Sequence, residues 1–135
     1  MTKERLKQMS VLFVEDEELP RIAIGKLLKR RVGSLHVGSN GREGLELFMA
    51  KRPDIVIADL ELPVLSGTEM IHRILEVDET VPVIVTTGYD DDDHRTRMAC
   101  RTLIKPIIFD DLLKAIYDAL ANSPKKVPSP LAGEG

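Results

Sequence analysis

The residues best suited to chemistry stand directly after apolar runs, at four separate places in the sequence. They are Glu15 and Asp16, Asp59, Thr87, and Lys105. Three carboxylates brought close together repel one another, and a divalent cation such as Mg²⁺ (or Mn²⁺) relieves the repulsion because it prefers oxygen ligands. Asp59 can then attack a phosphoryl donor, while the cation, Lys105 and Thr87 neutralise or bind the transferred oxygens. The set predicts metal-dependent phosphoryl transfer.

Each of these residues also has a purely structural interpretation. Acids at 15–18 suit a helix N-terminus, and Asp59 suits a turn before Pro63. Thr87 suits a strand because it is β-branched, and Lys105 suits a solvated turn. We favour the chemical interpretation because all four places carry such residues at once.

Five short apolar runs must position these residues. Three of them are continuously apolar and rich in Val and Ile, as are strands covered on both faces of a parallel sheet. The second is weaker, which fits an edge strand. The runs are 11–14, 34–37, 55–58, 81–85 and 103–104.

Helical patterns of about 10 to 15 residues separate the runs, a common helix length. They run from about 17 to 31, from near 41, from near 67, and from 109 to 121, and a poorer pattern opens at 90–93. The pattern from near 41 places Leu45, Phe48 and Met49 on one apolar face.

Strand followed by helix, five times, predicts an α/β fold. Its centre is a doubly wound, five-stranded parallel sheet, and its layers are α/β/α. We expect residues 1–122 to form this domain. Residues 123–135 contain three prolines and two glycines, and we expect a disordered tail or a linker stub there. In such a sheet the strand ends meet at one edge, which brings the candidate residues together.

Composition excludes several other classes of protein. The chain has 135 residues, one cysteine and a net charge of −3. No apolar run approaches the roughly 18 residues of a membrane span, so we expect no membrane association. The acidic balance gives no case for direct nucleic-acid binding. A single cysteine cannot form an internal disulfide, which fits a cytoplasmic protein.

Five motifs occur in a fixed order: VLFVEDEE at 11–18, DIVIADLELP at 54–63, SG at 66–67, PVIVTTGY at 82–89 and IKP at 104–106. Together they resemble the response-regulator receiver family of two-component signalling, over roughly Ser10 to Leu120. The chain is similar to a single, chemotaxis-regulator-like receiver. The resemblance implies the flavodoxin-like (βα)5 receiver fold.

The resemblance also implies roles for the acidic residues. Asp59 matches the phosphoacceptor. Glu15 and Asp16 match the acidic pair that binds Mg²⁺, with Asp16 the direct ligand. The main-chain carbonyl of Glu61 matches a further metal ligand, and its side chain lies at a position that tunes phosphoryl lifetime.

Further roles follow from the same resemblance. Thr87 matches the switch hydroxyl, and Gly88 matches the small residue that gives the donor access. Lys105 matches the lysine that pairs with the phosphoryl group, and its bond to Pro106 resembles one that is cis in the family. Tyr89 matches a second position that tunes phosphoryl lifetime.

Two features depart from the family pattern. Thr102 stands where the family has a Tyr or Phe whose rotation reports phosphorylation, and a small hydroxyl cannot replace that ring. The stretch between Thr87 and Lys105 is about four residues shorter than is typical, and Met98 replaces a glycine that often ends the fourth helix. We therefore predict that the chain does not use the usual fourth-helix face for dimers or partners, a prediction that hydrogen-exchange footprinting tests.

The first functional hypothesis is a phosphoacceptor switch that receives its phosphoryl group from a histidine kinase or a phosphotransfer protein. It would catalyse its own phosphorylation and dephosphorylation, but it would not be an enzyme for outside substrates. It would signal to a downstream protein, to an output domain absent from this sequence, or through a homodimer. Whether the chain acts alone or is a piece of a larger regulator stays open.

Three other classes of function compete with this hypothesis. A non-phosphorylated docking or dimerisation module is supported by Thr102 and the shortened segment. A flavodoxin-type nucleotide-binding protein is disfavoured because four acids at 15–18 would repel a phosphate. An Mg²⁺-dependent hydrolase fits the acid content alone, and the resemblance argues against it.

Overall fold

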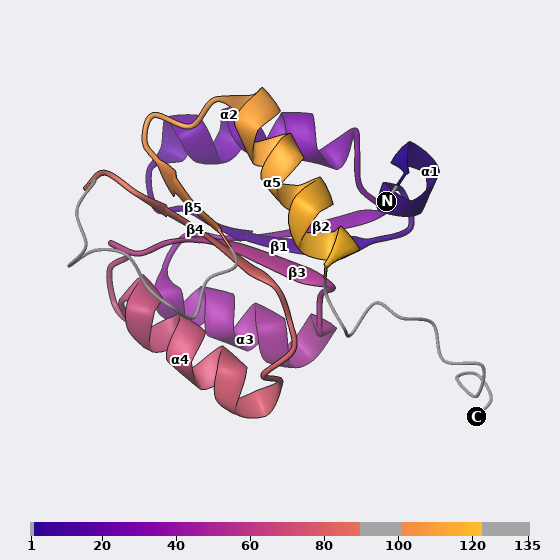
Figure 1. Cartoon of the computed structure of the whole chain (residues 1–135). Helices are drawn as coiled ribbons and strands as arrows, with labels where there is room; N and C mark the ends of the chain where they lie inside the picture. Colours follow the sequence, from indigo (N-terminus) through magenta and orange to yellow (C-terminus); the bar gives the residue numbers. More distant parts are fainter. Residues whose placement is uncertain (1, 90–100, 123–135) are drawn as a thin grey trace.

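The computed structural model describes residues 2–89 and 101–122. In this part of the chain, five strands form one parallel sheet in the order β2-β1-β3-β4-β5 (Figure 1). The strands are β1 (Ser10–Val14), β2 (Ser34–Gly38), β3 (Ile55–Asp59), β4 (Val83–Thr87) and β5 (Arg101–Ile104). This is the doubly wound, flavodoxin-like order, so the predicted fold class is confirmed. The weak second run is an edge strand, as predicted.

Helices cover both faces of the sheet and complete the three layers. They are α2 (Glu18–Lys29), α3 (Gly41–Lys51), α4 (Gly67–Val77) and α5 (Phe109–Ala121), with a short α1 (Lys3–Leu6) before β1. Helices α2 and α5 lie on one face of the sheet, and α3 and α4 lie on the other (Figure 1). No helix in the described ranges has the length and apolar character that crossing a membrane requires.

The continuous apolar runs have a physical reason in these two layers. Successive strand residues point to opposite faces. In β1, Val11 and Phe13 pack into the core under α2 and α5, while Leu12 and Val14 pack into the core over α3 and α4. All four side chains are buried. A strand buried on both faces therefore has no position for a polar residue until it reaches the end of the sheet.

The structure differs from the sequence-based expectation in strand limits and in one helix face. Strand β4 begins at Val83 rather than at residue 81, and it continues through Thr87. Met49 was predicted to be buried with Leu45 and Phe48, but it is 46% exposed, because the buried positions of α3 are Gly41, Gly44 and Phe48.

Helix α1 was not predicted, because its four residues are too short for a periodic pattern. Thr2 caps it by accepting a hydrogen bond from the Arg5 N–H at 3.1 Å. Leu6 anchors it in the core. The predicted short fourth helix at 90–100 and the predicted tail at 123–135 lie outside the described residues.

Gly67, the first residue of α4, lies directly against the main chain of Asp59. A Cβ atom added to Gly67 would lie 1.9 Å from the Asp59 carbonyl oxygen and 2.7 Å from the Leu60 Cα. We expect Gly67→Ala to lower the free energy of unfolding by about 3 kcal/mol, as overpacking against rigid main chain does. Urea denaturation measures this change.

Gly25 provides the matched control, because a Cβ added there meets no atom within 4 Å. Gly25 lies inside α2. We expect Gly25→Ala to raise stability by roughly 0.5–1 kcal/mol, because alanine loses less conformational entropy in a helix. Equal stability of the two variants would show that the turn after β3 yields easily, contrary to the packing.

Candidate functional site

The predicted chemical residues meet at the carboxyl edge of the sheet. Asp59 ends β3 and Thr87 ends β4, while Glu15 and Asp16 follow β1. Lys105 follows β5 directly, and its N–H donates to the Thr87 carbonyl oxygen at 2.8 Å. Because all five strands are parallel, residues that end different strands come together at this edge.

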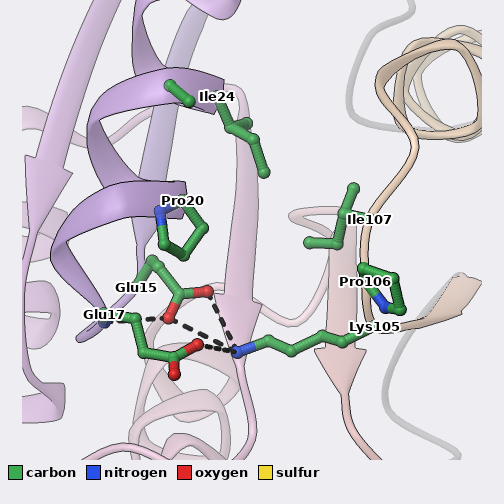
Figure 2. A pocket seen from close by; sticks show the side chains of 8 residues that line it. Glu15, Glu17, Pro20, Ile24, Lys105, Pro106 and Ile107 are labelled. Atoms are coloured by element: carbon green, nitrogen blue, oxygen red, sulfur yellow. Dashed lines mark hydrogen bonds and ion pairs between the residues drawn. The ribbon is translucent and has the colours of Figure 1, made fainter.

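The Lys105 ammonium group points toward the carboxylates of Glu15 and Glu17 (Figure 2). It pairs with Asp59, and its Nζ lies 3.1 Å from Glu15 Oε1 and 3.8 Å from Glu17 Oε1. Burial lowers the pKa of Lys105, but the hydrogen bonds and charges of Asp59 and Glu15 outweigh burial, so its pKa lies above the ordinary value. The ammonium group therefore stays charged at neutral pH.

Glu15 is fully buried, which is costly for a carboxylate. Burial raises its pKa, although the Glu17 N–H and Lys105 act in the opposite direction. The Glu17 N–H donates to Oε2 at 3.0 Å. Among the described residues, Oε1 accepts no hydrogen bond even though the ammonium group is near. This buried oxygen is ion-paired with Lys105 and lacks a hydrogen bond from the described residues, so it can serve as a ligand for a cation.

Three carboxylates form a compact acidic cluster. Glu15, Asp16 and Asp59 each offer one oxygen, and these oxygens lie within 4.8 Å of one another. Glu15 and Asp59 are buried, whereas Asp16 is exposed to solvent. An all-oxygen set with an exposed side suits Mg²⁺, which retains several waters. The residues present therefore fit the predicted metal.

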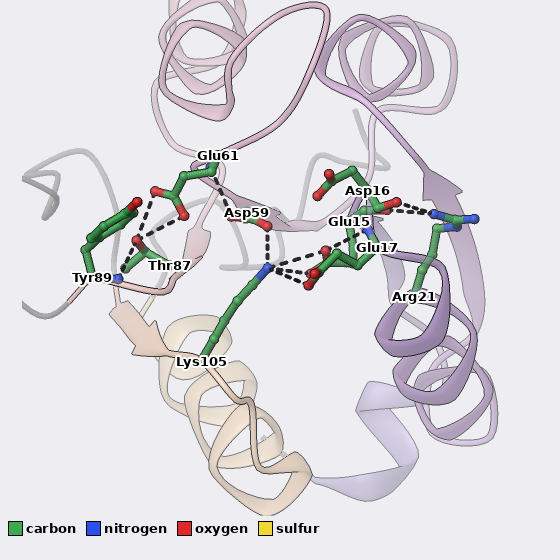
Figure 3. Close-up of polar contacts among 9 residues, drawn as sticks. All are labelled: Glu15, Asp16, Glu17, Arg21, Asp59, Glu61, Thr87, Tyr89 and Lys105. Carbon is green, nitrogen blue, oxygen red and sulfur yellow. Dashed lines mark hydrogen bonds and ion pairs between the residues drawn. The ribbon is translucent and has the colours of Figure 1, made fainter.

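Thr87 is engaged with Glu61, a contact that the sequence did not reveal (Figure 3). The Thr87 hydroxyl donates to the two Glu61 carboxylate oxygens, at 3.0 and 3.2 Å. The Tyr89 N–H donates to the Thr87 oxygen at 3.2 Å. The Glu61 N–H in turn donates to Asp59 Oδ1 at 3.0 Å. The only signal in the sequence was an acid two residues after Asp59.

The remaining predicted residues lie around this centre. The Lys105–Pro106 peptide bond is cis, as the resemblance implies. Gly88 is exposed, and a Cβ added to it meets no atom within 4 Å. Thr102 is half-buried and pairs with Val85 in the ladder between β4 and β5.

A pocket of about 470 Å³ opens beside Lys105 and Glu15 (Figure 2). Apolar residues of α2 and of the segment after β5 form most of its wall: Pro20, Ala23, Ile24, Pro106 and Ile107. Next to these residues in the sequence, Leu19 and Ile108 are 82% and 62% exposed. An apolar surface therefore lies next to the charged cluster.

Arg21 also contacts the acidic turn, although no pattern in the sequence predicts this contact. Its Nη1 donates to the main-chain carbonyl oxygens of Glu15, at 3.2 Å, and Asp16, at 2.9 Å. A hydrogen bond to a main-chain oxygen leaves no mark in the sequence, which explains why Arg21 was missed.

Comparison with known proteins gives a consistent result. A family model described as the response regulator receiver domain matches residues 11–117. Sporulation initiation phosphotransferase F of Bacillus subtilis is 26% identical over 110 residues, which covers 78% of this chain and 89% of that protein. A crystal structure of a response regulator receiver domain protein from Clostridium thermocellum has a TM-score of 0.75 and 30% identity, and covers 82% of this chain and 93% of that chain.

Longer relatives match over part of their length. The transcriptional regulatory protein AfsQ1 of Streptomyces coelicolor is 34% identical over 83 residues, which is 62% of this chain and 36% of that protein. The chain therefore spans about a third of the length of that relative. Other matching relatives are named as a protein-glutamate methylesterase and a cyclic di-GMP phosphodiesterase.

Proposed function

The chain belongs to the response regulator receiver domain family, and from this membership we propose that Asp59 is the residue that accepts its phosphoryl group. The chain is a phosphoacceptor regulator of two-component signalling. The observation that carries the assignment to Asp59 is its position: it is buried, ends β3, and pairs with Lys105 inside the acidic cluster.

Mg²⁺ or Mn²⁺ is the proposed cofactor. Glu15, Asp16 and Asp59, with the main-chain carbonyl of Glu61, would hold it. When bound, the cation neutralises negative charge on the transferred oxygens. Two observations on the described residues support this assignment: the buried Glu15 Oε1 accepts no hydrogen bond, and the three carboxylates lie within 4.8 Å of one another.

The chain's own residues then divide the work of the transfer. A carboxylate oxygen of Asp59 forms a bond to phosphorus as the bond from phosphorus to the donor breaks. Lys105, already charged and beside Asp59, stabilises the negative charge on the phosphoryl oxygens. Thr87 exchanges its Glu61 acceptor for a phosphoryl oxygen, which draws the end of β4 toward Asp59.

A histidine kinase or a phosphotransfer protein is the proposed donor. The pocket beside Lys105 supports a protein donor, because most of its wall is apolar. The proposed role is signalling in the cytoplasm, through a partner, an output domain or a homodimer, with catalysis limited to the chain's own phosphorylation and dephosphorylation.

Incubation with Mg²⁺ and acetyl phosphate, followed by intact mass, tests the function. We expect a single phosphoryl adduct that EDTA prevents. The second candidate, a docking module that is never phosphorylated, is favoured by Thr102 in place of an aromatic residue. It predicts no adduct and no spectral response to Mg²⁺ with beryllofluoride.

Neutralising Glu15 should separate fold stability from metal binding. We expect Glu15→Gln to stabilise the metal-free chain by about 1 kcal/mol at neutral pH, because a charged carboxylate no longer has to be buried. Folding raises the pKa of Glu15. The free-energy cost of burying its charge is therefore absent below the pKa of the unfolded chain, and it grows as pH rises through the pKa of the folded chain. The gain should therefore vanish toward pH 4.5, the ordinary pKa of a glutamate side chain.

With Mg²⁺ bound, the wild type should become more stable than Glu15→Gln. Saturating Mg²⁺ stabilises the wild type by about 2.7 kcal/mol at a hundred times its Kd, and it should stabilise Glu15→Gln less. Thermal unfolding with and without Mg²⁺ measures both effects. Glu18→Gln is the control, because Glu18 is exposed on α2. Equal Mg²⁺ stabilisation of Glu15→Gln and wild type would remove Glu15 from the metal site.

Thr87→Ala should uncouple phosphorylation from the conformational change. The adduct should still form, because Asp59 and Lys105 remain, but alanine cannot bind a phosphoryl oxygen. We expect the phosphorylation-dependent change in amide hydrogen exchange at 87–89 and in β5 to fall severalfold. Thr68→Ala, at an exposed position of α4, should leave it unchanged. An unchanged exchange response in Thr87→Ala would contradict the switch role.

A further inference from the structure

Arg21 contacts the acidic turn from the side away from Asp59 and Lys105 (Figure 3). Its Nη1 donates to two consecutive carbonyl oxygens, those of Glu15 at 3.2 Å and Asp16 at 2.9 Å. Both hydrogen bonds come from the same nitrogen of Arg21. Because each accepting carbonyl belongs to a different peptide group, they fix the orientation of two peptide planes in the turn between β1 and α2. The two residues fixed in this way are the acids that supply carboxylates to the cluster.

We propose that Arg21 is a positioning residue for the metal site, which holds the main chain of Glu15 and Asp16 so that both carboxylates converge on Asp59. This inference rests on the proposed function, since it concerns the cation used in phosphoryl transfer. Arg21 would not touch the cation or the phosphoryl group.

The turn needs such support because no side-chain cap at the start of α2 stabilises it. Glu17 is the N-cap of α2, and its side chain makes no capping hydrogen bond. The Glu15 carboxylate fixes the Glu17 N–H instead, at 3.0 Å. Asp16 is exposed, and in the described ranges its carboxylate has no hydrogen-bond donor. The position of Asp16 therefore depends on its main chain, which Arg21 holds.

Charge strengthens the same argument. Residues 15–18 are four consecutive acids, and Asp59 adds a fifth carboxylate. Lys105 neutralises part of this charge on the inner side of the turn. The guanidinium group of Arg21 supplies a positive charge on the outer side, where it limits repulsion without occupying the space between the carboxylates. A ligand set held ready in this way loses less entropy when it binds a cation.

Arg21→Met tests the proposal, because it keeps an apolar stem and removes the donors and the charge. We expect the Kd for Mg²⁺, measured by titration calorimetry, to rise about tenfold, the lower end of the effect of removing a group that orients metal ligands. The Mg²⁺ concentration for half-maximal phosphorylation by acetyl phosphate should rise equally. The maximal rate at saturating Mg²⁺ should stay within about twofold, because Asp59, Lys105 and Thr87 are untouched.

Two further variants complete the design. Arg21→Lys retains donors and charge and should restore most of the Mg²⁺ affinity. It also provides the test if Arg21→Met does not fold, since it must then bind Mg²⁺ more weakly than wild type. Arg30→Met is the control, because Arg30 is exposed at the far end of α2 and should not alter Mg²⁺ binding.

Three outcomes would overturn the role of Arg21. They are an unchanged Kd and unchanged maximal rate in Arg21→Met, an unchanged Kd with a lower maximal rate in Arg21→Met, and an equal loss of affinity in Arg30→Met. Failure of the proposed function is a separate result, in which wild type binds Mg²⁺ by calorimetry but forms no adduct. The Mg²⁺ affinities of the Arg21 variants still decide the positioning role in that case.

Discussion

Asp59→Asn should form no phosphoryl adduct with Mg²⁺ and acetyl phosphate under conditions in which the wild type is phosphorylated. A carboxamide has the shape of the carboxylate but is not a nucleophile toward phosphorus at neutral pH, so the expected loss is complete. The fold should survive, because the amide oxygen can still accept the Glu61 N–H that now donates to Asp59 Oδ1. Intact mass measured over time gives the result, and denaturant unfolding confirms the fold.

Asp111→Asn is the matched control for this prediction, because Asp111 is an exposed acid in the first turn of α5. It should be phosphorylated at the wild-type rate. An adduct in Asp59→Asn would assign the phosphoryl group to another residue. A wild type that binds Mg²⁺ and never forms an adduct would favour the docking module.

Lys105→Met should slow phosphorylation by acetyl phosphate roughly 10²-fold at saturating Mg²⁺, the usual cost of losing one group that stabilises transition-state charge. Among the described residues, Lys105 is the basic residue that pairs with Asp59. Its Nζ also lies 3.1 Å from Glu15 Oε1. Methionine retains an unbranched chain of similar length but carries no charge, so packing beside Pro106 changes little. Single-turnover rates from intact mass measure the effect.

The same variant should bind Mg²⁺ severalfold more tightly than wild type. The ammonium group repels a cation that approaches the acidic cluster, and its loss leaves three carboxylates without that neutralising charge. A slower rate together with a tighter Kd separates the electrostatic role of Lys105 from general damage, which would weaken both. Lys114→Met, at an exposed position of α5, should change neither quantity. A weaker Kd in Lys105→Met would contradict this account.

Much of the fold could be predicted because burial on two faces leaves a simple pattern. In β1 and β3 every position of the strand interior must be apolar, whichever layer it faces, so the strands stand out as continuous runs. The buried faces of the helices were harder to predict. Met49 continued the apolar pattern of α3, yet the close approach of Gly41 and Gly44 to the rest of the fold gives α3 its buried face without it.

The sequence determined one part of the site, and the tertiary structure determined the rest. The sequence by itself determined which residues end the strands, and since parallel strands end at one edge, it brought Asp59 and Lys105 together. Only the tertiary structure decided which atoms meet, because residues 46 and 90 positions apart contact through the packing of separate elements. It buried the Glu15 carboxylate beside Lys105, joined Thr87 to Glu61, and placed Arg21 against two carbonyl oxygens. Those contacts depend on side-chain direction and on main-chain acceptors, which every residue possesses and no sequence pattern distinguishes.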